Sequence, residues 1–555
     1  MVLPLDMVRG LWSIAITSCI AALIYFFSKF YAARQTIWRM QKAGLPTPDY
    51  SSLGGHFPLI KKIMETLPSD SIIHNIMWKI SEDYPNGIFY LSLWPFGGTM
   101  MVLADADAAS QLDSWALSKG VDIIDPIEKV TGGKSLLTMK GDEWKHWRRL
   151  FNPGFSAGYM MGLAPVIADE VALYRQKLLA KCETGQSQVF LLEDLTLRMT
   201  FDIIGSVVLN TRLGHQTRDH PLAAALRKQI EWTSFREPLN PVERYLNIRP
   251  LVLWLNGKKL DQYLSVEIDQ ILADRSANLS HSNDTTRSKS IASLFIDEYL
   301  KDLDEEGLDK GEDADTTWKI KHIITPQVRL FLFAGHDTTS STLLYCYYLL
   351  SRNPEIVSLI IAEHNKVFGT DPSQVQDKVH RDPQLLNQIP YTVAFIKEVL
   401  RIFAPAGAMR QGRPDVQIVD ADGRVLPTKG CHVWTLVQAI HHNPKYWKDP
   451  DACIPERWLV GPGDPLYPHK GAWRPFEWGP RNCIGQTLAM IELRVALVMT
   501  VREFVIKPAY EDWDKLYPKS GIRSVNGNRA YQAHKGGGGA HPADGFPVKI
   551  GLRHG

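Results

Sequence analysis

The sequence predicts a mainly helical protein with small β-sheets, preceded by one transmembrane helix at its N-terminus. An uncharged apolar run, Gly10–Ser28, lies near the start of the chain. Val416–Val419 and Gly430–Leu436 are short and have β character, with Asp422-Gly423 as the turn between them. Longer segments carry apolar residues at helical spacing. These helices are expected over Asp169–Cys182, Leu195–Leu209, Leu264–Ala277, Thr325–Arg352, Glu355–Phe368 and Pro390–Phe403.

The N-terminal run is long enough to cross a bilayer. Its 19 residues carry no formal charge, and at 1.5 Å per residue they would span roughly 28 Å, close to the ~30 Å hydrocarbon core. Four basic residues follow, Lys29, Arg34, Arg39 and Lys42. The positive-inside tendency then places the rest of the chain in the cytosol, and we expect a single-pass protein of the endoplasmic reticulum. The alternative, a cleaved signal peptide, would need a small-residue cleavage site, and none is evident.

A Pro-containing segment separates this anchor from the rest of the chain. Gly44-Leu45-Pro46-Thr47-Pro48 has the composition of a stiff hinge. We therefore expect residues 1–43 to form a membrane anchor with a basic linker, and residues 44–555 to form one catalytic domain. Length alone would suggest more domains, but the motifs from Trp144 to Gly485 all point to one site.

The helix over Pro390–Phe403 carries a candidate ion pair. Glu398 and Arg401 are three residues apart, which places them on one helix face. Most such pairs are solvated and contribute little to stability. Here the neighbouring residues are apolar, which favours a buried pair that needs a further partner.

One cysteine near the C-terminus lies in a loop of aromatic, glycine and proline residues. The stretch Phe476-Glu477-Trp478-Gly479-Pro480-Arg481-Asn482-Cys483-Ile484-Gly485 lets backbone approach closely at its glycines. A thiolate that binds iron beneath a flat macrocycle needs such a setting, although a buried structural cysteine would also fit. The pattern F-x-x-G-x-R-x-C-x-G resembles the haem-binding loop of the cytochrome P450 superfamily, in its membrane-anchored eukaryotic form. The overall style is similar to fungal members that modify secondary metabolites.

This resemblance implies a helical prism that encloses haem b (iron protoporphyrin IX), with Cys483 as the iron ligand and Phe476 and Gly485 beside it. It also implies that Arg457, in Pro455-Glu456-Arg457-Trp458, joins Glu398 and Arg401 in a structural network.

The long helix contains a second family motif. Its centre reads Ala334-Gly335-His336-Asp337-Thr338-Thr339 and resembles A-G-x-D/E-T. The resemblance makes Thr338 the hydroxyl of oxygen activation, Asp337 the acid that relays protons, and Ala334 a cofactor neighbour. Gly335 and the threonines are expected to loosen the helix locally and turn Asp337 toward a solvent channel. The alternative is an ordinary helix with a polar face.

Haem propionates are anions that need cationic partners. Trp144-Lys145-His146-Trp147-Arg148 resembles the family's W-x-x-x-R helix, which assigns Trp144 and Arg148 to the propionates. Arg481 is a second family position. The loop after the Glu398 helix offers Arg413, or failing that Arg410; spacing does not choose firmly between them, and we prefer Arg413.

Composition agrees with an ordinary globular enzyme. The chain has 555 residues, 45% hydrophobic and 22% charged, with a net charge of +2, which shows no bias toward nucleic acid. Its six cysteines include no C-x-x-C, so neither a disulfide framework nor a zinc site is indicated. Gly536–Gly539 is expected to be a hairpin loop.

The resemblance implies a haem-thiolate monooxygenase that inserts one oxygen atom of O2 into an organic molecule. Electrons are expected from a separate NADPH-dependent cytochrome P450 reductase, since too little chain follows Cys483 for a flavin domain. The alternatives are a haem-thiolate isomerase, dehydratase or other non-oxygenating haem protein, and a membrane-anchored scaffold. An apolar, membrane-soluble substrate such as a terpenoid, polyketide or alkaloid is expected. Its pocket should draw on a loop at Gly120–Lys140 and on Ile230–Pro241, Phe331–Phe333 and Ala404–Met409.

Overall fold

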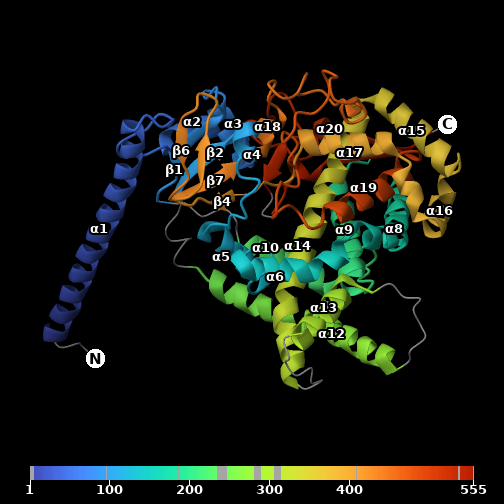
Figure 1. The fold of residues 1–555 in the computed structure, drawn as a ribbon, viewed down its shortest axis with the longest axis horizontal. Coiled ribbons are helices and arrows are strands. Elements are labelled where there is room, and N and C mark those ends of the chain that lie inside the picture. Colours follow the sequence, from blue (N-terminus) through green and yellow to red (C-terminus); the bar gives the residue numbers. More distant parts are fainter. Residues whose placement is uncertain are drawn as a thin grey trace.

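A long helix, α14 (Ala314–Arg352), runs through the middle of the protein, and the other helices pack around it (Figure 1). The computed structural model describes residues 5–95, 97–183, 188–233, 247–280, 289–305, 314–407, 409–534 and 538–553. The predicted helical class with small sheets is confirmed. Pro326 lies inside α14, and the helix begins eleven residues before the predicted start at Thr325.

Most of the helices lie before α14 in the chain. They are α1 (Leu5–Lys42), α2 (Phe57–Met64), α3 (Ile73–Ser81), α4 (Ala106–Ser110), α5 (Val121–Thr131), α6 (Gly141–Phe151), α7 (Ala157–Gly162), α8 (Ala164–Glu183), α9 (Leu192–Leu209), α10 (Pro221–Thr233), α12 (Arg249–Ser280) and α13 (Ile291–Glu305). Those after it are α15 (Pro354–Phe368), α16 (Val375–Arg381), α17 (Pro390–Ile402), α18 (Val437–His441), α19 (Gln486–Thr500) and α20 (Tyr510–Leu516). Every predicted helix is present, and the predicted bounds agree best where a glycine or proline marks the end.

The largest of the described sheets combines two strands from the N-terminal part of the chain with two strands that follow α17. It has the order β1 (Ile88–Ser92), β2 (Thr99–Leu103), β7 (Cys431–Thr435) and β4 (Met409–Gln411). Strands β2 and β7 are parallel, with Thr99 opposite Cys431, and the other two pairings are antiparallel. The sheet therefore places the segment after α17 beside the N-terminal part of the body.

Three smaller sheets are present in the described part of the chain. They pair β5 (Gln417–Val419) with β6 (Val425–Pro427), β9 (Gln532–His534) with β10 (Ala540–Pro542), and β11 (Pro547–Leu552) with both β3 (Phe190–Leu191) and β8 (Phe504–Pro508). The expected turn at Asp422-Gly423 therefore joins β5 to β6, and the prediction that it joins β5 to Gly430–Leu436 was wrong. β7 pairs instead with β2, a distant strand that local sequence does not reveal.

The N-terminal helix projects along one side of the molecule (Figure 1). Trp12–Lys42 is long and apolar enough to cross a membrane, with a mean hydropathy of 1.7, and its apolar window is fully exposed. Its later turns touch the body, because Phe26 and Phe30 pack on Trp94 with ring centroids 5.2 and 5.6 Å apart. The segment that follows is also tied down, since Tyr90 N–H donates to Pro46 O at 2.8 Å. The expected hinge is thus attached to β1.

The ion pair on α17 is buried and has the third partner that was predicted. Glu398, Arg401 and Arg457 have fully buried side chains. Arg401 donates to both carboxylate oxygens of Glu398, at 2.8 and 3.0 Å, and Arg457 Nε donates at 3.1 Å. This network joins α17 to the turn that contains Arg457 and supports the region before the Cys483 loop.

Candidate active site

The Cys483 loop leads directly into the N-terminus of α19, with Gly485 as the residue before the helix. Burial raises the pKa of the Cys483 thiol, while N–H groups of Gly485 and Gln486 and the charge of Arg148 act in the opposite direction. Cys483 is nevertheless an exposed residue. The thiol is therefore accessible, although the protein around it removes much of its contact with bulk water. The helix N-terminus favours a thiolate there.

The loop around Cys483 is held tightly. Cys483 N–H donates to Phe476 O at 2.9 Å, which closes the turn. Gly479 has φ +80°, and a Cβ there would lie 2.0 Å from the carbonyl oxygen of Asp113, so only glycine fits. A Cβ on Gly485 would make an ordinary 3.9 Å contact with Cys483 Sγ. The required close approach is therefore at Gly479.

One face of α14 is open in the middle of an otherwise buried stretch. Ala334 is exposed and Thr338 partly exposed, whereas Val328–Phe333 and Thr339–Leu350 are buried. Thr338 Oγ1 donates to Ala334 O at 2.9 Å. The helix is continuous here, so the expected loosening at Gly335 is wrong. A Cβ on Gly335 would lie 2.7 Å from Ile204 Cδ1, so this glycine permits close packing of α14 on α9.

Asp337 does not open onto a solvent channel, which corrects that expectation. Its side chain is buried, and Oδ2 accepts a hydrogen bond from Gly539 N–H at 2.7 Å. Oδ1 lies 3.0 Å from Nε2 of His541 on β10. Asp337 and Thr338 are consecutive and point in different directions, so the structure brings only Thr338 to the open face with Ala334.

Several cations gather beside the Cys483 loop. The Arg481 guanidinium lies 4.6 Å from the ring of Trp144, and Nη2 donates to Met139 O at 2.7 Å. Arg148 donates to the carbonyl and side-chain oxygens of Asn482, at 3.1 and 3.2 Å. Burial lowers the pKa of Arg481 to about 10 and also lowers the pKa of Arg148. Trp144, Arg148 and Arg481 are therefore brought together as expected.

Arg410 and Arg413 lie in different surroundings, and the structure brings Arg410, not the preferred Arg413, to the cations beside the Cys483 loop. Arg413 is half-exposed, pairs with Asp415 and lies over the ring of Trp115. Arg410 is largely buried, and its Nη2 donates to Arg481 O at 3.4 Å. Arg410 lies in strand β4, which ends at Gln411. Arg413 follows the end of the strand and lies outside the cluster.

Lys119 is a further member of the cluster that sequence reasoning missed. It is buried, and its pKa is lowered to about 7 by burial first and by the charge of Arg410, with Glu477 opposing. Within the described residues Glu477 is the carboxylate that pairs with this group, 3.8 Å from Arg410. Desolvated cations without enough carboxylates fit a bound dianion such as the two propionates of haem. No motif around Lys119 signals this role.

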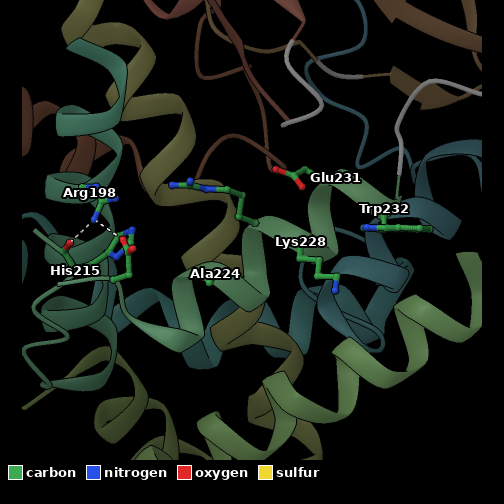
Figure 2. Close-up of a pocket in the computed structure, with 8 residues that line it drawn as sticks. Arg198, His215, Ala224, Lys228, Glu231 and Trp232 are labelled. Carbon is green, nitrogen blue, oxygen red and sulfur yellow. Dashed lines mark hydrogen bonds and ion pairs between the residues drawn. The ribbon is translucent and has the colours of Figure 1, made fainter. Parts of the chain in front are cut away.

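A separate cavity of about 390 Å³ lies between α9 and α10 (Figure 2). Figure 2 shows Arg198 and His215 on one side, and Lys228, Glu231 and Trp232 on the other. Arg198 donates to His215 O at 3.0 Å and pairs with Asp219 at 2.8 Å. A lining this ionic does not suit an apolar substrate, so this cavity is not assigned to the Cys483 site.

The expected pocket segments have mixed outcomes. Phe331–Phe333 is buried on α14. Only the second part of Gly120–Lys140 lacks helix, because α5 occupies Val121–Thr131, so the expectation of a continuous loop was wrong there. Ile230 is buried in the core, whereas residues 234–241 and 408 lie outside the described residues. The predicted hairpin at Gly536–Gly539 is flanked by β9 and β10, although residues 536 and 537 are also outside the described part.

Comparison with known proteins decides the family. The family model for cytochrome P450 matches residues 53–531. The chain belongs to the cytochrome P450 family. This P450 is 37% identical, over 99% of its length and 96% of the relative's, to cytochrome P450 monooxygenase polC of Polytolypa hystricis. It is 30% identical to cytochrome P450 monooxygenase acrF of Aspergillus aculeatus, over 83% of this chain and 94% of the relative.

The fold of this P450 also has a solved counterpart. The crystal structure of the cytochrome P450DA heme domain superposes with a TM-score of 0.67 at 21% identity, covering 92% of this chain and 97% of that one. The protein is a cytochrome P450 monooxygenase with one apolar N-terminal helix that could span a membrane. The family implies haem as cofactor, and the cationic cluster beside Cys483 fits it.

Proposed function

We propose that this monooxygenase inserts one oxygen atom of O2 into an apolar small molecule, with haem b held by Cys483, as a modifying step in secondary metabolism. The observation that carries the proposal is the Cys483 thiol before α19, which is accessible although protein surrounds it. From this we infer an internal hollow beside the thiol. The similarity of this chain to two fungal monooxygenases supports the activity. The open face of α14 at Ala334 and Thr338 is proposed to border the same hollow.

The residues around Cys483 have separate tasks. Haem, when bound, supplies the redox chemistry that activates O2, and a thiolate ligand favours cleavage of the O–O bond. Gly485 and Gln486 N–H groups stabilise the Cys483 thiolate. Arg410, Arg481 and Lys119 would hold the propionates. Their low solvent exposure strengthens charge pairing with a carboxylate.

Thr338 has a hydroxyl placed for proton delivery at the open face. In the described state Oγ1 donates to Ala334 O, and rotation about χ1 would let the same hydrogen reach a water in the hollow. A hydroxyl that holds such a water can assist proton transfer. Asp337 is expected to affect proton delivery only indirectly, because both of its carboxylate oxygens already contact Gly539 and His541.

The proposed substrate is apolar, in the class of terpenoids, polyketides or alkaloids. Phe331 and Phe333 are buried on α14 within the turn that precedes Ala334. Apolar walls formed near these residues would exclude water and favour a hydrophobic ligand with few polar groups.

Electrons are proposed to come from a separate NADPH-dependent cytochrome P450 reductase, with the protein held at the endoplasmic reticulum and its body in the cytosol. Lipid contact is supported by α1 and by apolar residues exposed on the first turns of α12, Leu251, Trp254 and Leu255. Deleting residues 1–28 should move the protein toward the soluble fraction while leaving haem bound. The cationic cluster begins at Lys119, well beyond the deleted residues. Loss of haem on this deletion would contradict the assignment.

A ligand-substitution experiment tests the haem-thiolate assignment. The reduced protein with CO should show the strongly red-shifted Soret band of thiolate ligation, and Cys483→His should lose that band and the oxygenase activity. Cys182→Ala is the matched control, because Cys182 lies on α8 away from this loop. An unchanged CO spectrum and full turnover in Cys483→Ala would show that the axial assignment is wrong.

A further inference from the structure

Three ionisable side chains fasten the C-terminal hairpin to the helices beneath it. His541 on β10 is 3% exposed. Its Nε2 lies 3.0 Å from Asp337 Oδ1 on α14, and its Nδ1 lies 2.9 Å from Glu193 Oε1 on α9. The contact between Nδ1 and Glu193 is an ion pair, because the angles at Nδ1 do not suit a hydrogen bond. One cation thus bridges carboxylates from two helices.

His541 and Asp337 hold opposite charges at neutral pH. Burial acts to lower the pKa of His541, but the charges of Asp337 and Glu193 raise it to about 10. Burial acts to raise the pKa of Asp337, but His541 lowers it to about 2. Other titratable groups lie nearby. His336 interacts with the charges of Asp337 and His541. Tyr345 and Tyr510 interact with the charge of Glu193. With the proton held firmly on His541, the triad is better suited to a static clamp than to a proton relay.

The clamp holds Gly538 and Gly539, the residues that directly precede β10, against α14. Gly539 N–H donates to Asp337 Oδ2 at 2.7 Å, and a Cβ on Gly539 would lie 2.8 Å from that oxygen. A Cβ on Gly538 would lie 2.4 Å from Phe333 Cζ. Phe333 and Asp337 are four residues apart and share a helix face, next to the face formed by Ala334 and Thr338. Gly538 and Gly539 therefore lie beside the open stretch of α14.

We propose that His541 is a positioning residue that sets substrate specificity, because the Glu193–His541–Asp337 triad fixes Gly538 and Gly539 as a wall of the substrate pocket. The inference rests on the proposed function, since it takes the open face of α14 as the substrate side of the haem. The triad contributes rigidity, and a rigid wall binds a bulky ligand better than one that must be ordered on binding.

Two iron-binding azoles of different size test the proposal without knowledge of the substrate. The full-length haem-bound protein in detergent is titrated with imidazole and with 4-phenylimidazole, and the Soret shift gives each dissociation constant. His541→Gln should weaken 4-phenylimidazole binding about tenfold, a change of about 1.4 kcal/mol, and leave imidazole nearly unchanged. Asp337→Asn should act in the same direction, and the double variant should be little worse than either, as expected for members of one network.

A matched control separates this role from general destabilisation. Arg529→Gln also removes a cation shared by two carboxylates, Asp514 and Asp544, in the C-terminal region. It should leave the ratio of the two azole affinities unchanged. Where His541→Gln fails to accumulate, Glu193→Gln removes only the outer partner and should shift the ratio in the same direction by a smaller factor.

The outcomes are distinct. An unchanged affinity ratio in His541→Gln, with the thiolate CO band intact, would overturn the proposal. If the ratio is unchanged and the solvent isotope effect on turnover is altered, the triad is a proton relay instead of a clamp, and the proposal is likewise overturned. Absence of the thiolate CO band from the wild-type protein would instead refute the proposed function.

Discussion

Replacing Glu398 with alanine is expected to lower the free energy of unfolding by about 3–5 kcal/mol, because one buried carboxylate neutralises two buried arginines. Arg401 and Arg457 have side chains with 0% exposure, as has Glu398. The substitution removes the anion and leaves both guanidinium charges in the core. Solvent cannot compensate them without opening the packing between α17 and the segment around Arg457.

The contacts that are lost and kept set this magnitude. The Glu398 carboxylate also accepts from Ile454 N–H at 3.1 Å and from Trp458 Nε1 at 3.2 Å. After its removal Arg401 still donates to carbonyl oxygens, including His441 O at 2.7 Å. Those carbonyls satisfy N–H groups but do not neutralise the charge. A loss of about 3–5 kcal/mol is a large share of the 5–15 kcal/mol that typically separates folded from unfolded proteins.

Urea unfolding followed by far-ultraviolet circular dichroism measures the effect, with the slope checked for constancy between variants. Glu398→Gln should fall between wild type and Glu398→Ala, because the amide oxygen still accepts one hydrogen bond. Glu65→Gln is the control: its pair with Lys61 spans 3.9 Å and both side chains are mostly exposed, so a change below about 0.5 kcal/mol is expected. A loss below about 1 kcal/mol in Glu398→Ala would refute the reasoning.

Three further predictions follow from the site. Arg410→Ala should weaken haem retention, whereas Arg413→Ala should not, as measured by haem transfer to an acceptor protein; equal effects would contradict the placement of Arg410. Thr338→Ala should keep haem and substrate binding but lower the fraction of NADPH electrons that reach product by about tenfold, with peroxide released instead; full coupling would remove this role from Thr338. Because the pKa of Asp337 is lowered to about 2 and that of His541 raised to about 10, their contribution to stability should be full between about pH 4 and 6.5. This contribution should fall as the pH drops toward 2 or rises toward 10. In a plot of urea midpoint against pH, His541→Gln should lose the part of the slope that this pair causes in both ranges.

Local sequence was enough to predict the helices and the Cys483 loop. Apolar spacing along Pro390–Phe403 and Leu195–Leu209 marks one buried face, which is a property of consecutive residues. The Cys483 ligand position is also local, because the glycine at 479, the arginine at 481 and the cysteine occupy one short turn. The third partner of Glu398 and Arg401 was predicted because burial of a charged pair requires compensation, and the family resemblance named Arg457.

Tertiary structure alone decided which distant groups meet. The partner of Asp337 is His541, 204 residues away, and no pattern around either residue indicates the pair. The same holds for Lys119, which is buried near Arg410 and Arg481 although both arginines lie far along the chain. Gly335 was expected to loosen α14 and instead admits Ile204 of α9. Periodicity describes which face of an element is buried, whereas long-range pairing depends on the packing of elements that the chain brings together only when folded.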